Sequence, residues 1–165
     1  MHPLKLQPSR ALALLFIAEA LLAFAPVAIL APAIGWPASL RNPAAQQLAA
    51  IAAHPDAVKW GYGLYLLYSV LIAAVGVGLS ARWGGGLQRP WAAAAAGFIA
   101  LSALARAIGI LRWLTVMPVL AQAHGAGDAA AQTQLTIVFD TVHAWGGGIG
   151  EVLGVSLFMA YGLAA

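Results

Sequence analysis

Long apolar stretches separated by short polar segments dominate the chain. A helix needs about 20 apolar residues to cross a bilayer core of about 30 Å, and four stretches meet this requirement. They cover residues 11–34, 61–81, 91–121 and 135–165. None shows the strict alternation of a strand, and helices satisfy their own backbone hydrogen bonds inside a membrane. The pattern therefore predicts an all-α, polytopic membrane protein, a bundle of four transmembrane helices.

Composition narrows the class further. Of the 165 residues, 62% are hydrophobic, 8% are charged and none is cysteine, whereas a soluble domain carries about 25% charged residues. The formal net charge of +3 is spread along the chain instead of forming a basic patch, which argues against nucleic-acid binding. Residues 1–165 are thus expected to form a single transmembrane domain whose surroundings are membrane lipid.

The basic residues predict an orientation. Lysine and arginine concentrate in the cytoplasmic loops of membrane proteins. A cytoplasmic N-terminus and C-terminus place four of them inside and two outside. The inner group is Lys5, Arg10, Arg82 and Arg89, and the outer group is Arg41 and Lys59. The first stretch is too long for the apolar region of a signal peptide and contains Glu19, so we expect a retained helix.

Two connections are predicted on the outer side of the membrane. Residues 35–60 form the longer one, and its alanine-rich part, residues 43–54, can make a short helix on the outer surface. We favour an ordered linker for this part. Residues 122–134 contain Gly125, Gly127 and Asp128 and predict a flexible, exposed loop.

Six ionisable side chains fall inside the predicted spans. A charge at the bilayer centre costs about 2.5–3.5 kcal/mol on insertion scales, so such residues are functional or structural candidates. They are Glu19, Arg106, Arg112, Asp140, His143 and Glu151. Three of them share one face of the last span at about 100° per residue. This face is expected to point toward protein or water.

A glycine pattern runs beside that polar face. Gly146, Gly150 and Gly154 have the four-residue spacing that lets two helices pack closely. Counting inward from the span ends pairs Arg112 with Asp140 or His143. The same count pairs Arg106 with Glu151. Because the two arginines point about 120° apart on their helix, the alternative is that one of them pairs with Glu19 on the first span.

Three interpretations of the cluster remain open. In the favoured one, ion pairs lock the helices together, and the protein is a structural or accessory component that binds itself or a larger complex through the glycine face. In the second, the cluster is a proton pathway or the site of a small-solute carrier. In the third, it binds a metal or haem. Asp140 and His143 have the spacing of di-metal bundles, but that pair occurs once and no second membrane histidine exists, so neither metal nor cofactor is expected.

Enzymatic motifs are not found in the sequence. None of its serines lies in a nucleophile elbow, and no glycine-rich phosphate-binding motif with Lys and Ser or Thr occurs. The sequence therefore offers no catalytic residues and argues against an enzyme without deciding the question.

Two segments carry a resemblance to a known family. They are RAIGILRWLTVMPVLA at residues 106–121 and VFDTVHAWGGGIGEVLG at residues 138–154. Together they resemble the bacterial family of multi-pass membrane proteins known as domain of unknown function 4386. The resemblance covers the last third of the chain. It implies a bacterial inner membrane location but no activity, substrate or cofactor. Its members continue with further helices, and the apolar end at Ala165 leads us to expect the same here.

Overall fold

The computed structural model describes residues 10–83 and 86–164. Lys5, which contributes to the charge count above, and Ala165 lie outside this part of the chain. The described residues form helices joined by short turns. In chain order these are α1 (Arg10–Ile34), the 3-10 helix η1 (Ala38–Arg41), α2 (Ala44–Ala53), α3 (Pro55–Trp83), α4 (Pro90–Leu114), α5 (Val116–Ala126), α6 (Ala129–Gly147), the π-helix η2 (Gly148–Met159) and α7 (Ala160–Ala164).

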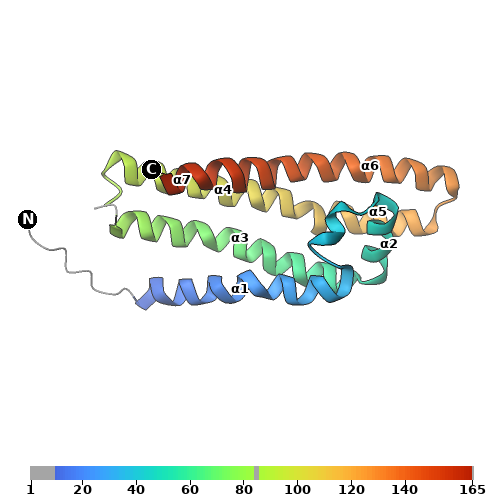
Figure 1. The fold of residues 1–165 in the computed structure, drawn as a ribbon, viewed down its shortest axis with the longest axis horizontal. Helices are drawn as coiled ribbons and strands as arrows, with labels where there is room; N and C mark the ends of the chain where they lie inside the picture. The colour runs from blue at the N-terminus through green and yellow to red at the C-terminus, as the bar shows by residue number, and fades with distance from the viewer. Residues whose placement is uncertain (1–9, 84–85, 165) are drawn as a thin grey trace, which may run out of the picture.

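The long helices lie side by side and run alternately up and down (Figure 1). α1 packs against α3, α3 against α4, and α4 against the continuous helix formed by α6, η2 and α7. α1 begins and α7 ends at the same end of the bundle, whereas α2 and α5 cover the other end (Figure 1). This arrangement confirms the predicted all-α bundle.

Three helical segments are long and apolar enough to cross a membrane: Arg10–Ile34, Pro55–Arg82 and Pro90–Ala126. The helix from α6 through α7 supplies the fourth member of the bundle. α3 begins six residues before the predicted apolar boundary because Pro55 starts it, and proline suits the first helical position. α4 ends at Leu114 because Pro118 has no N–H to donate to the Leu114 carbonyl.

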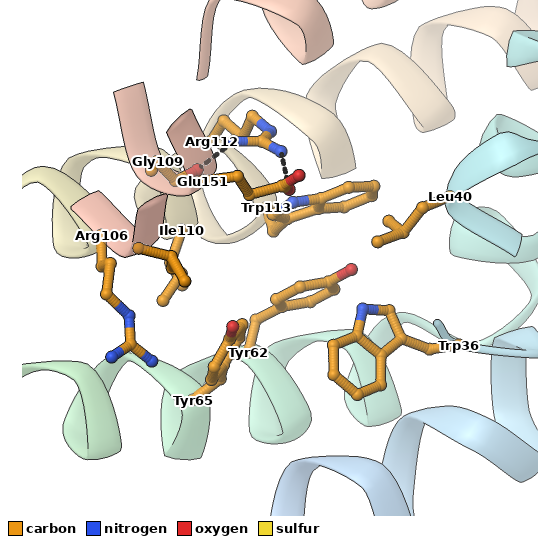
Figure 2. A pocket seen from close by; sticks show the side chains of 12 residues that line it. Trp36, Leu40, Tyr62, Tyr65, Arg106, Gly109, Ile110, Arg112, Trp113 and Glu151 are labelled. Carbon is orange, nitrogen blue, oxygen red and sulfur yellow. Dashed lines mark hydrogen bonds and ion pairs between the residues drawn. The ribbon is translucent and has the colours of Figure 1, made fainter. Parts of the chain in front are cut away.

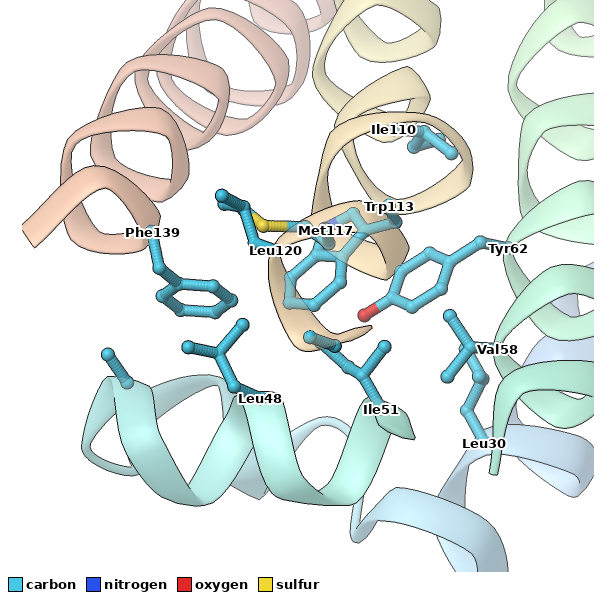
Figure 3. Close-up of a cluster of buried hydrophobic side chains, with 12 residues drawn as sticks. Leu30, Leu48, Ile51, Val58, Tyr62, Ile110, Trp113, Met117, Leu120 and Phe139 are labelled. Atoms are coloured by element: carbon cyan, nitrogen blue, oxygen red, sulfur yellow. The ribbon is translucent and has the colours of Figure 1, made fainter. Parts of the chain in front are cut away.

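The alanine-rich segment is a packed helix, so the expectation of a linker was wrong. Ala44, Leu48 and Ile51 lie on one face of α2, as the helical period requires, and all three are buried. Figure 3 shows Leu48 and Ile51 pointing from α2 into a cluster that includes Trp113 and Met117. Tertiary packing of this apolar face therefore makes a short helix part of the core.

The expected flexible loop at residues 122–134 was also wrong. α5 continues to Ala126 and α6 begins at Ala129, so a two-residue turn joins them. The Asp128 carboxylate caps α6 by accepting a hydrogen bond from the Ala131 N–H at 2.9 Å. The Gln132 side-chain amide donates to the carbonyls of His124 and Gly127, both at 3.2 Å.

A hydrophobic core fills the end of the bundle beneath α2. Tyr62 from α3 and Trp113 from α4 stack at its centre, with ring centroids 4.7 Å apart and an interplanar angle of 2°. The other fully buried large side chains include Leu30, Val58, Met117 and Phe139 (Figure 3). This core packs α3 directly against α4.

Candidate functional site

Glycines bring α4 and the C-terminal helix into backbone contact. A Cβ placed on Gly109 would lie 2.8 Å from the Gly146 carbonyl oxygen and 2.8 Å from the Gly150 Cα. Gly154 lies against Arg106, and the Ser102 hydroxyl donates a 2.6 Å hydrogen bond to the Gly154 carbonyl. The glycine face therefore packs against α4 of its own chain, where a partner helix has no access to it.

This helix contact produces a different pairing of charged residues from the one predicted by counting residues inward from the span ends. Glu151 Oε1 lies 3.8 Å from Arg112 Nη2, and Arg112 Nη1 also donates to the Gly109 carbonyl at 2.7 Å. The expected pairing of Glu151 with Arg106 does not form. Counting residues from the span ends assumed regular α-helices. The structure instead has a helix break at Thr115 and wider π-helical turns from Gly148.

Arg106 points in another direction, toward α3 (Figure 2). Its side chain is buried, and its guanidinium carbon lies 4.9 Å from the ring centre of Tyr68 and 5.9 Å from that of Tyr65. These distances are within the range of cation–π contacts. Among the described residues Arg106 has no ion-pair partner, and its Nε forms no hydrogen bond. It is thus a buried cation whose guanidinium group lies against two aromatic rings.

The other predicted members of the polar cluster separate. Asp140 is exposed on α6, away from the pocket lining. His143 is half-buried and packs its ring on Phe139, at 5.6 Å between centroids, and on Trp113, at 5.5 Å. Glu19 is buried in α1. Within residues 10–83 and 86–164, no three His, Asp or Glu side chains gather closely enough to hold a metal ion.

A pocket of about 190 Å³ lies between α3, α4 and η2 (Figure 2). Arg106 and Arg112 line it, together with Glu151, so its walls carry two cations and one carboxylate. The remaining lining residues are mainly aromatic or apolar: Trp36, Leu40, Tyr62, Tyr65, Gly109, Ile110, Trp113, Gly150 and Val155. In Figure 2 the two arginines point to opposite sides of α4, with the aromatic rings between α4 and α3.

Several polar atoms at this pocket are without partners. The Tyr62 hydroxyl and the Nε atoms of Arg106 and Arg112 are buried and form no hydrogen bond. The Glu151 side chain is 68% exposed although it lies in the membrane-spanning bundle. A carboxylate facing lipid is costly, so Glu151 requires polar surroundings at the pocket mouth.

Sequence reasoning missed the aromatic half of the site. Tyr62, Tyr65 and Tyr68 recur at three-residue intervals in the segment GYGLYLLY of α3, a helical spacing that places polar hydroxyls along an apolar span. That spacing was a usable signal for a polar face. It does not reveal which helix the face meets, because pairing with α4 depends on the tertiary fold.

Comparisons with curated proteins and with solved structures return no match. A family model, described as a domain of unknown function (DUF4386), matches residues 11–165. The match includes α1, α2 and α3 as well as the C-terminal helices that carried the resemblance. The chain therefore belongs to the DUF4386 family.

Proposed function

We propose that this chain is a multi-pass protein of the bacterial inner membrane that binds a small organic anion in the pocket between α3, α4 and η2. The observation that carries the proposal is the charge of the pocket wall. Arg106 and Arg112 line it with a single carboxylate, that of Glu151.

Both cations are buried, and only one of them has a carboxylate in direct contact. Arg112 has Glu151 beside it, whereas Arg106 has no ion-pair partner among the described residues. A buried cation without a contacting carboxylate is unfavourable in a membrane interior, and a bound anion can pair with it directly. Guanidinium groups also match the planar geometry of a carboxylate through paired N–H donors. A carboxylate ligand therefore fits Arg106 both in charge and in shape.

Size and lining define the rest of the ligand. Cavities of about 150 Å³ accept a benzene ring, and this pocket measures about 190 Å³. The rings of Tyr62, Tyr65 and Trp113 provide flat apolar walls, which suit an apolar or planar body. An acid of about the size of benzoate satisfies both the walls and the arginine.

The basic residues that the structure describes are distributed as the expected membrane orientation requires. Arg10, Arg82 and Arg89 lie at the end of the bundle where α1 begins, and Arg41 and Lys59 lie at the other end. An excess of basic residues marks the cytoplasmic side, so we place the N-terminus there. The pocket is then nearer the outer side, below the connection that holds Trp36 and Leu40.

This arrangement favours a solute-binding, carrier-type function over the accessory role. The accessory interpretation required charges that lock the helices and a glycine face open to a partner. Arg112 and Glu151 form one ion pair in this cluster, Arg106 is left without one among the described residues, and α4 covers the glycine face. A pocket lined by a cation that no carboxylate contacts is better suited to receive a ligand.

Calorimetry on the purified chain in lipid nanodiscs tests the proposal. Benzoate is the probe, and benzamide is its neutral control of nearly the same shape. Loss of a charge-assisted hydrogen bond weakens binding by about 10- to 100-fold, so benzamide should bind more weakly than benzoate by this factor. The variant Arg106→Gln should lose benzoate affinity by the same factor, while Arg89→Gln, which removes an exposed cation, should not. Equal binding of benzoate and benzamide, or no binding of either, contradicts the proposal.

A further inference from the structure

Glu19 is a buried acid that anion binding alone does not explain. It lies in the middle of α1 and is 8% exposed, and neither of its carboxylate oxygens has a hydrogen-bond partner. It does not line the pocket. An ionised carboxylate in such surroundings requires either a nearby positive charge or a proton.

Glu19 lies at about the same depth in the bundle as Arg106. Leu30 of α1 lies against Gly61 of α3, and Leu12 lies against Gly78. Counting along the two antiparallel helices places Glu19 level with residues 71 and 72 of α3, within one turn of Ser69.

The same count relates α3 to α4. Ile99 lies against Gly76, which places Arg106 level with Ser69. Ser69 is fully buried, and its hydroxyl also has no hydrogen-bond partner. One layer across α1, α3 and α4 thus holds the carboxyl group of Glu19, the hydroxyl group of Ser69 and the guanidinium group of Arg106. Each has a buried polar atom without a hydrogen-bond partner.

Few other ionisable groups face this layer. From α4 the group is Arg106, whose charge acts on Glu19. From α3 the groups are Tyr65 and Tyr68, which contact Arg106. α2, the other described helix that packs on α1, contains no ionisable side chain. Arg106 is therefore the cation available to Glu19 and also the cation available to a ligand.

We propose that Glu19 is a proton-binding site coupled to the anion pocket through Arg106. Without ligand, the ionised Glu19 balances the charge of Arg106 across the layer. When an anion binds Arg106, the guanidinium compensates the ligand, and the Glu19 carboxylate takes one proton from water onto an oxygen. The layer is neutral in both states, so the anion and the proton bind together. This inference rests on the proposed function and adds a proton to each anion bound.

Proton uptake on ligand binding is the first test. A pH-indicator dye in weakly buffered nanodisc samples reports protons taken up when benzoate is added. Linkage predicts about one proton per benzoate for the unmodified chain and about none for Glu19→Gln, which still binds benzoate. Asp56→Asn, which removes an exposed acid in the first turn of α3, should behave like the unmodified chain. Benzoate binding without proton uptake overturns the coupling and leaves the proposed function intact.

A second test needs no ligand. Arg106→Gln removes the counter-charge, so Glu19 should be protonated at neutral pH. Infrared difference spectra between Arg106→Gln and the double variant with Glu19→Gln should show the band of a protonated carboxyl group in apolar surroundings. The corresponding difference between the unmodified chain and Glu19→Gln should lack it. Absence of the band in the Arg106→Gln difference overturns the coupling, even if benzoate proves not to be a ligand.

Discussion

Arg112 and Glu151 form an ion pair of unequal partners. Their closest atoms, Nη2 and Oε1, are 3.8 Å apart, yet the arginine side chain is 6% exposed and the glutamate side chain 68% exposed. The guanidinium is also fixed by its hydrogen bond to the Gly109 carbonyl. The carboxylate is therefore the less constrained member of the pair, and it lies at the mouth of the pocket.

Removing the carboxylate should destabilise the bundle moderately. Glu151→Gln leaves Arg112 buried without its counter-charge, which is unfavourable, but the exposure of Glu151 limits the loss to about 1 kcal/mol. Thermal unfolding in mild detergent measures the effect. A double-mutant cycle with Arg112→Gln should give a coupling of about 0.5–1 kcal/mol. Strictly additive effects of the two substitutions would show that the pair does not interact.

The glycine contact between α4 and η2 should tolerate no side chain. Gly109→Ala places a Cβ 2.8 Å from backbone atoms of Gly146 and Gly150, which flexible side chains cannot relieve. We expect a loss of about 1–3 kcal/mol, the range for overpacked cores, and a weaker benzoate site. Gly97→Ala is the matched control, because it lies on the same helix with open space around it. It should stabilise by up to about 1 kcal/mol, and an equal effect of both substitutions would refute the close approach.

α2 should contribute to stability as part of the core. Leu48 is fully buried against α5 and α6, so Leu48→Ala should cost about 2–5 kcal/mol. Gln46, on the exposed side of the same helix, provides the control, and Gln46→Ala should change stability by less than about 0.5 kcal/mol. Chemical unfolding in detergent compares the two. A neutral Leu48→Ala would mean that α2 is a surface linker after all.

The turn between α5 and α6 should depend on its cap. Asp128→Ala removes the acceptor of the Ala131 N–H and should cost about 0.5–2 kcal/mol, whereas Asp128→Asn keeps an oxygen at the same place. Amide hydrogen exchange over residues 129–133 measures fraying of α6. We expect faster exchange in the alanine variant alone. Identical exchange in the unmodified protein and both variants would argue against the cap.

Hydropathy was sufficient to predict the bundle, because apolar length and the absence of alternation leave few alternatives in a membrane. The two wrong expectations share a physical cause. The segment at residues 43–54 and the loop at residues 122–134 are short and only weakly patterned, so tertiary packing and one cap decide their structure. Leu48 illustrates this, since its helix is stabilised by contacts with α5 that no local pattern contains.

The candidate site was predictable in its residue types but not in its pairings. Arg106, Arg112 and Glu151 stand out as charges within apolar spans, and all three line one pocket. Which arginine meets Glu151 depends on helix register, and the break at Thr115 and the π turns of η2 alter that register. The aromatic walls came from α3, where tyrosines in an apolar helix look like ordinary lipid-facing or interfacial residues.

Native mass spectrometry of the chain released from mild detergent with benzoate present shows whether Arg106 forms an anion site. We expect one bound benzoate per chain for the unmodified protein and for Arg89→Gln, and none for Arg106→Gln. An unmodified chain without benzoate, or benzoate retained by Arg106→Gln, would contradict an anion site built on Arg106.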